Sequence, residues 1–129
     1  MPVDDAAGDP AEGDWRGGWL RGALELAAAA VLAERPLHGY ALAQRLAELG
    51  FGQVRGGVLY PVLGRLEADG VVTATWQAGS GGPGRKVYTL TGAGQRRLAA
   101  QRAQWRAFSL AMDGLLAPVG AADESGTGG

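Results

Sequence analysis

The chain has 129 residues, with 12 Lys and Arg, 13 Asp and Glu, one His and no Cys, and its formal net charge is −1. At roughly 100–200 residues per domain, this length predicts one globular domain with tails. The lack of cysteine excludes disulfide bonds, thiolate zinc sites and a cysteine nucleophile, and a single histidine excludes a multi-histidine metal site.

The charged residues are unevenly distributed along the chain. Residues 1–14 hold five acids and no base, and residues 118–129 hold two acids and no base. Both segments are rich in Gly, Ala and Pro, a composition that predicts disordered tails. Residues 15–117 hold all 12 bases, 11 of them Arg, and six acids, which leaves a charge of +6 there. We expect the acidic tails either to aid solubility or to compete with an anionic partner for the basic domain.

Two helices are expected at the start of the domain. The spacing of apolar residues predicts the first over residues 19–35, and Pro36 ends it because the residue before a proline avoids helical geometry. A turn at His38–Gly39 leads into a second helix over about residues 40–49. The predicted inward faces carry Leu20, Leu24, Ala27, Val31 and Leu32 in the first helix, and Leu42, Leu46 and Leu49 in the second.

A third helix is expected over about residues 58–69. Gly70 follows it as the C′ residue that commonly ends a helix, and Pro61 is tolerated because it lies in the predicted first turn. The predicted inward residues of this helix are Leu59, Val62, Leu63 and Leu66.

A short β-hairpin and a long helix are expected to follow. Residues 71–76 are rich in β-branched side chains and predict a strand, residues 77–84 a flexible loop, and residues 86–90 a returning strand. Thr91 is expected to cap a final helix that runs to about residue 116.

This order of elements predicts a mainly α fold with a small β-hairpin, namely a winged helix-turn-helix domain over residues 15–90 and a dimerisation helix over residues 91–117. The last helix has two series of residues seven apart, offset by three, as in the a and d positions of a coiled coil. Such a seam predicts a homodimer; the alternative is that these residues pack on their own domain. The predicted dimer interface comprises Leu98, Trp105, Phe108, Met112 and Leu115, and Gln101 completes the second series.

No motif in the chain predicts catalysis, a metal site or a cofactor. Residues 79–84 match the dinucleotide fingerprint formally, but they precede a predicted strand, whereas that fingerprint opens a helix. A hairpin tip is the better interpretation. His38 has no acid near it in sequence and is expected to be a turn histidine, and Glu67 and Asp69 are expected to be solvated. We therefore expect a protein that is not an enzyme.

No segment predicts a membrane span or a secretion signal. The longest apolar run, residues 26–33, has eight residues, far below the ~20 that a bilayer requires. The acidic start lacks the positive region of a signal peptide. A cytoplasmic location is expected.

Four short stretches carry a family resemblance. They are LRG at residues 20–22 with PLHGY at 36–40, GVLYPVLGRLEADG at 57–70, Trp76 with GPGRKVY at 82–88, and LT at 90–91 with Gly94. In this order and spacing they resemble the PadR family of transcriptional regulators over residues 19–116, and the single last helix is similar to that of the smaller members. The resemblance implies a homodimeric repressor of a pseudo-palindromic double-stranded DNA operator.

The resemblance makes the third predicted helix the recognition helix, which would enter the major groove, while the hairpin would reach phosphates or the minor groove. Tyr60 is then expected to touch the DNA backbone, and Arg65 either reads guanine or pairs with an acid of its own helix. Val58 stands where the family usually has Ser or Thr, which removes one expected phosphate contact. Gly64 stands where the family often has His, and it weakens the helix by ~1 kcal/mol relative to Ala. The candidate DNA contacts are Arg55, Tyr60, Arg65, Arg85 and Lys86.

The resemblance also implies a small-molecule effector. Small members bind planar aromatic compounds at the dimer interface beside a Trp fourteen residues after the Thr of the Leu-Thr motif, which is the position of Trp105 here. The alternative is that Trp105 only packs in the dimer. A different class of function, a winged-helix module that binds protein and has weak or lost DNA binding, is favoured by Val58 and the acidic tails. The predicted effector site comprises Trp19, Gln101, Trp105 and Ser109.

Overall fold

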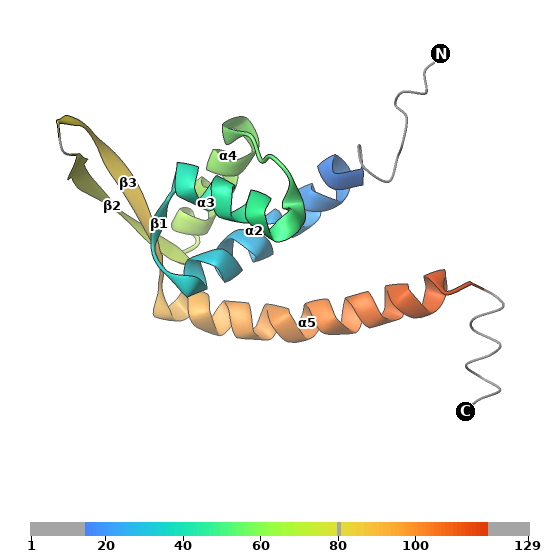
Figure 1. Cartoon of the computed structure of the whole chain (residues 1–129). Helices are drawn as coiled ribbons and strands as arrows, with labels where there is room; N and C mark the ends of the chain where they lie inside the picture. The colour runs from blue at the N-terminus through green and yellow to red at the C-terminus, as the bar shows by residue number, and fades with distance from the viewer. Residues whose placement is uncertain (1–14, 80, 119–129) are drawn as a thin grey trace, which may run out of the picture. The chain divides into compact units, whose positions relative to one another are not determined.

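The computed structural model describes residues 15–79 and 81–118, so the predicted tails lie outside the described residues except for Pro118. The elements, in chain order, are helix α2 (Trp15–Glu34), strand β1 (Leu37–His38), helix α3 (Gly39–Leu46), the π-helical segment η1 (Ala47–Phe51), helix α4 (Gly56–Ala68), strands β2 (Val72–Gly79) and β3 (Gly82–Leu90), and helix α5 (Gly92–Leu116) (Figure 1). The chain divides into two compact units, residues 1–98 and residues 99–129. The predicted mainly α fold is confirmed.

The core of the first unit is formed by the inward faces of α2, α3 and α4. The four inward residues predicted for α4 are at most 4% exposed, and Leu42 and Leu46 of α3 are fully buried. Leu20 and Ala27 of α2 are partly buried against this core. The prediction for Leu49 is wrong, since its side chain is 46% exposed. The α-helix ends at Leu46, and the π-helical segment that follows is broken by a kink at Gly50, whose φ of +101° is not helical, so Leu49 lies beside the kink and off the inner face.

Helix α4 begins two residues earlier than predicted. The carbonyl of Arg55 accepts hydrogen bonds from the amides of Val58 and Leu59 at 3.0 and 2.9 Å, so the first turn forms there. Pro61 therefore lies inside the helix, beyond the first turn, and the predicted first-turn position is wrong. Because proline has no amide hydrogen, this site lacks one backbone hydrogen bond to the carbonyl four residues earlier.

The end of α4 has the geometry predicted from Gly70. This residue has φ +76°, and its amide donates to the carbonyl of Glu67 at 3.1 Å. The amide of Val71 donates to the carbonyl of Leu66 at 2.9 Å. These two bonds form a Schellman motif, which satisfies carbonyls at the end of a helix and requires the left-handed conformation that glycine adopts readily.

The sheet has three antiparallel strands in the order β1-β3-β2, one more than the predicted hairpin. Strand β1 forms where a turn at His38–Gly39 is predicted, with Leu37 opposite Tyr88 and His38 opposite Val87. A strand of two residues has no alternation to recognise, so only its pairing with β3 defines it.

The hairpin of β2 and β3, which we call the wing, is longer than predicted. Most of residues 77–84, predicted as a loop, continue the strands, and Gly79 pairs with Gly82 after a register shift. Figure 1 shows the wing extending away from the helices. Antiparallel pairing uses backbone groups only, so a glycine-rich sequence can form strands where a partner strand is adjacent. The interpretation of these glycines as the end of a hairpin is confirmed.

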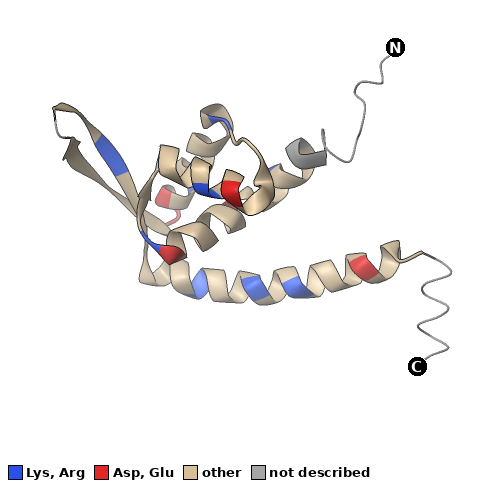
Figure 2. Cartoon of the chain, in the orientation of Figure 1, with Lys and Arg blue, Asp and Glu red and all other residues tan. Residues whose placement is uncertain are grey.

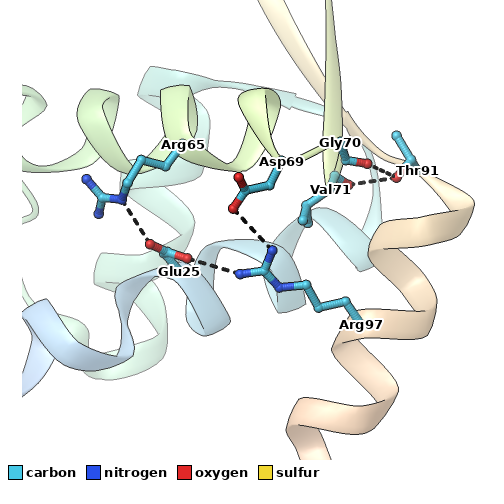
Figure 3. A network of polar contacts seen from close by, with 7 residues as sticks. All are labelled: Glu25, Arg65, Asp69, Gly70, Val71, Thr91 and Arg97. Carbon is cyan, nitrogen blue, oxygen red and sulfur yellow. Dashed lines mark hydrogen bonds and ion pairs between the residues drawn. The ribbon is translucent and has the colours of Figure 1, made fainter.

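Thr91 joins the start of α5 to the end of α4 (Figure 3). Its hydroxyl oxygen accepts a hydrogen bond from the amide of Gly94 at 2.9 Å, which confirms the predicted cap, and lies 2.6 and 3.0 Å from the carbonyl oxygens of Gly70 and Val71. A Cβ at Gly94 would overlap the carbonyl oxygen of Val71. The Leu-Thr motif and its glycine therefore form the tight junction between the two helices.

The second unit contains α5 beyond Leu98. Leu98 itself is 3% exposed and belongs to the core of the first unit. The large apolar side chains farther along α5 are all exposed, to between 36% and 78%: Trp105, Phe108, Leu110, Met112, Leu115 and Leu116. Across the described ranges 15–79 and 81–118, no helix is both long and apolar enough to cross a bilayer.

Candidate nucleic-acid interface

Two clefts flank α4 in the first unit. The wing cleft, of about 660 Å³, lies between α4, the start of α3 and the wing. The helix cleft, of about 640 Å³, lies between α3, η1 and the first turns of α4. Tyr40 and Tyr60 line both clefts and therefore join them into one surface around the start of α4. The exposed residues of α4 that line neither cleft are Gly57, Val58, Pro61, Arg65 and Ala68.

The helix cleft carries polar groups at the N-terminus of α4. Arg55 is the N-cap residue of α4; it is exposed and its side chain makes no capping hydrogen bond. Gln44 and Gln53 line the same cleft. The first amides of a helix have no intrahelical acceptor and the helix dipole makes this end positive, so it favours an anion. Arg55 adds a full positive charge at that end.

The wing cleft carries two basic side chains, each with a contact inside the chain. Arg85 Nη1 lies 3.1 Å from His38 Nε2, and Lys86 Nζ lies 3.3 Å from Glu67 Oε1. Lys86 also lies 5.7 Å from the centre of the Tyr88 ring, and burial raises the pKa of Tyr88 above its usual value. Figure 2 shows the basic part of the wing in blue. Of the described residues that line this cleft, Glu67 is the one acid.

The sequence His-Gly-Tyr positions the aromatic side chains of this surface. His38 is the N-cap of α3, where its Nδ1 lies 3.4 Å from the amide nitrogen of Ala41. Its ring is parallel to that of Tyr40, with 6.4 Å between the centroids. The ring of Tyr60 lies so close to Gly39 that a Cβ at Gly39 would overlap it. The predicted turn histidine is therefore a helix cap, and the glycine admits the Tyr60 ring.

Arg65 lines neither cleft. Its Nε lies 3.0 Å from Glu25 Oε2 of α2, and Glu25 Oε1 lies 3.4 Å from Arg97 Nη2 of α5 (Figure 3). Arg97 also pairs with Asp69 at 3.3 Å. One predicted alternative, that Arg65 pairs with an acid of its own helix, is wrong, because the acid that it contacts lies on α2. To read a base while it keeps this contact, Arg65 would have to use its two Nη groups.

The predicted effector residues are divided between the two units. Trp19 is in the first unit and is 72% exposed, whereas Gln101, Trp105 and Ser109 lie beyond Leu98 on α5. Gln101 and Ser109 are partly buried, and the Ser109 hydroxyl lies 3.2 Å from a carbonyl oxygen of the preceding turn. Of the predicted dimer residues, Leu98 packs on its own domain, which is what the alternative to a dimer seam predicts. The other four are exposed.

Sequence reasoning missed aromatic residues of the clefts. Tyr40 lines both clefts at 67% exposure, and Trp76 lines the wing cleft at 72% exposure. His38 lines the wing cleft as well. A signal was available for Trp76, because residues opposite one another on paired strands share a face of the sheet, and Trp76 is opposite Lys86. Tyr40 directly follows the His-Gly pair of the family stretch.

The first unit has three helices and a small sheet whose hairpin forms a wing beside the third helix, with basic and aromatic side chains around that helix. This arrangement defines a winged helix-turn-helix regulator of transcription. The profile described as the transcriptional regulator PadR-like family matches residues 29–100, and the chain belongs to this family. The resemblance found in the sequence is confirmed. Members of this family are transcriptional regulators, which are not enzymes.

Relatives support the same conclusion. The chain is 41% identical over 70 residues to a transcriptional regulator of Mycobacterium tuberculosis; the match covers 54% of this chain and 64% of that protein, which is less than two thirds of its length. A PadR family regulator from Eggerthella lenta is similar in structure, with 33% identity, a TM-score of 0.67 and coverage of 78% of this chain and 87% of that chain. A PadR-like regulator from Bacillus cereus has 31% identity, a TM-score of 0.68 and coverage of 77% and 96%.

Proposed function

We propose that the chain is a homodimeric repressor that binds a pseudo-palindromic operator through α4 and the wing, and that a small planar ligand releases it. One observation carries the DNA-binding proposal. Four of the five predicted contacts, Arg55, Tyr60, Arg85 and Lys86, line two clefts on either side of one helix. A helix that enters the major groove has phosphates along both sides, and basic groups there hold the protein in register.

The exposed face of α5 supports the homodimer. Trp105, Phe108, Met112 and Leu115 follow the spacing of the a and d positions and are 36–78% exposed. Because Leu98 is buried in its own domain, the proposed seam begins at Trp105. A dimer would present two α4 helices to half-sites whose centres are about 34–36 Å, or a multiple of this, apart.

The ring of Trp105 supports the ligand proposal. It lies 5.8 Å from the ring of Phe108 with 43° between the planes and is 48% exposed. Gln101 and Ser109 lie one turn to either side of it on α5. An exposed aromatic pair offers a large flat area for stacking, and two such pairs would face one another across a dimer seam.

DNA binding is tested with a labelled duplex of the DNA upstream of the gene, over NaCl concentrations of about 50–200 mM. Replacing Arg85 and Lys86 together by Ala should weaken binding to this duplex and to an unrelated one alike, and should reduce the salt slope by up to about two. Replacing Arg102 and Arg106 of α5 by Ala removes the same charge and serves as the control. A flat salt response of the unchanged protein would contradict the proposal and favour the protein-binding module.

The dimer is tested at Leu115. Sedimentation should show a dimer that Leu115→Glu dissociates, because an ionised side chain in an apolar seam is strongly disfavoured.

The ligand site is tested at Trp105. Planar aromatic dyes should quench the tryptophan fluorescence of the unchanged protein, and Trp105→Ala should remove that quenching. Trp76→Ala, which deletes an exposed Trp of the wing, is the control and should retain it. Quenching that persists in Trp105→Ala would overturn the stacking site.

A further inference from the structure

Provided that the proposed DNA binding holds, one DNA strand would run through the wing cleft. The two grooves of a duplex are separated by a single sugar–phosphate backbone. A protein that places a helix in one groove and a hairpin at the next must therefore hold that backbone between the helix and the hairpin. Here the space between α4 and the wing is the wing cleft.

The walls of the wing cleft match the chemistry of such a strand. Arg85 and Lys86 supply positive charge from β3, and the exposed residues Tyr40 and Tyr60 of the helices carry hydroxyl groups. The 72%-exposed ring of Trp76 supplies an apolar surface for a sugar. A DNA strand alternates charged phosphates with less polar sugars. It therefore fits a cleft that has both basic and apolar walls.

The two basic side chains are held by groups of different charge. Arg85 contacts the imidazole of His38, whose other nitrogen lies 3.4 Å from the Ala41 amide. A neutral imidazole has one acceptor nitrogen, so it can accept from Arg85 or cap α3 but cannot do both. Arg85 can thus leave for a phosphate at little cost. Lys86 instead faces the carboxylate of Glu67 at 3.3 Å, and both side chains are less than two fifths exposed.

We propose that Glu67 sets the affinity of this protein for the DNA backbone. In the free protein Glu67 holds Lys86 in the wing cleft. When a phosphate strand occupies the cleft, the carboxylate repels the phosphate and competes with it for Lys86. Because the contact involves the backbone and no base, Glu67 lowers affinity for every DNA sequence by the same factor.

The test measures binding of a fluorescein-labelled duplex of mixed sequence, about 30 base pairs long, by anisotropy across the same salt range. Glu67→Gln should raise affinity roughly 3- to 10-fold at low salt and steepen the salt slope by up to about 0.9, the contribution of one further phosphate contact. Glu48→Gln removes the same charge from the ion pair with Arg45, which lines neither cleft, and should change affinity less than about 2-fold.

A second pair of variants separates the action of Glu67 on Lys86 from general repulsion. In a Lys86→Ala background, Glu67→Gln should give less than half of its original gain, since the lysine that it frees is absent. The proposal is overturned if Glu67→Gln behaves like Glu48→Gln, weakens binding, or keeps its full gain without Lys86. In each of these cases the unchanged protein still binds DNA and the proposed function stands. Failure of the unchanged protein to bind any duplex would overturn both.

Discussion

The two units of the chain differ in what covers their apolar side chains. In the first unit, Leu24, Leu42 and Leu63 are completely buried by other parts of the same unit. In the second, Trp105, Phe108 and Leu115 are about half to three quarters exposed. All of these residues follow regular helical spacing. The spacing therefore identifies a face of a helix, but only the rest of the fold or a partner determines what that face packs against.

This difference separates the sources of stability. The first unit combines three helices, a sheet and the Thr91 junction, and it buries the apolar side chains of its core without a second chain. The exposed apolar face of α5 carries the proposed dimer seam, since contiguous apolar patches on soluble proteins commonly bind partners. Substitutions of the same chemistry in the two units should therefore have unequal or opposite effects.

The largest difference is expected for leucine truncation. Leu63→Ala should lower the free energy of unfolding by about 2–5 kcal/mol, because it loses apolar burial and leaves a cavity. Leu110→Ala, on α5 outside the proposed seam and 64% exposed, should change it by less than about 0.5 kcal/mol. Urea denaturation followed by circular dichroism measures both. Equal losses would show that the second unit buries Leu110 against something.

Two glycines of α5 should respond with opposite signs. Gly94→Ala places a Cβ onto the carbonyl oxygen of Val71, and the backbone shift needed to relieve it should destabilise the protein by about 1–3 kcal/mol. Gly114→Ala meets no atom within 4 Å and should stabilise it by about 0.5–1 kcal/mol, because alanine loses less backbone entropy in a helix. Thermal unfolding reports both signs. A Gly94→Ala protein of unchanged stability would contradict the close packing of the junction.

The sequence predicted features that depend on local rules. The buried positions Leu59 and Leu63 follow from helical spacing, Gly70 from the conformation that ends a helix, and Thr91 from capping chemistry. Strand β1 and the exposure of Leu49 were missed, because the first depends on pairing with a distant strand and the second on a π-helical turn. Neither leaves a periodic pattern in the sequence.

The candidate site shows the same division. Arg85 and Lys86 could be predicted because they lie in a short family stretch at the wing. The partners could not: Arg65 meets Glu25, 40 residues earlier, and Lys86 meets Glu67 across the wing cleft. Contacts between distant residues follow from tertiary packing, which a single sequence does not specify by spacing.

A smaller effect is expected from the ion pairs that join α2, α4 and α5. Glu25→Gln removes the carboxylate that both Arg65 and Arg97 contact. Since these side chains are one third to more than half exposed, the loss should be only about 0.5–1 kcal/mol in unfolding free energy. Asp113→Asn removes an equal charge from the second unit and should have less effect. A loss that does not shrink in high salt would show that the network acts through packing and not through charge.

The smallest effect is a pH dependence at the end of α2. The hydrogen bond from Arg45 lowers the pKa of Glu34 below 4.5, against a weaker opposing effect of desolvation. A carboxyl whose pKa is lower in the folded state stabilises the fold above its unfolded pKa, and this stabilisation is lost as the pH falls through the folded pKa. The stability advantage of the unchanged protein over Glu34→Gln should therefore be constant near neutral pH and should shrink below about pH 4.5. Arg45→Gln removes the other member of this pair. It should likewise reduce the fall of the urea midpoint at acid pH. An advantage over Glu34→Gln that does not shrink at all on acidification would mean that Glu34 acts through packing and not through its charge.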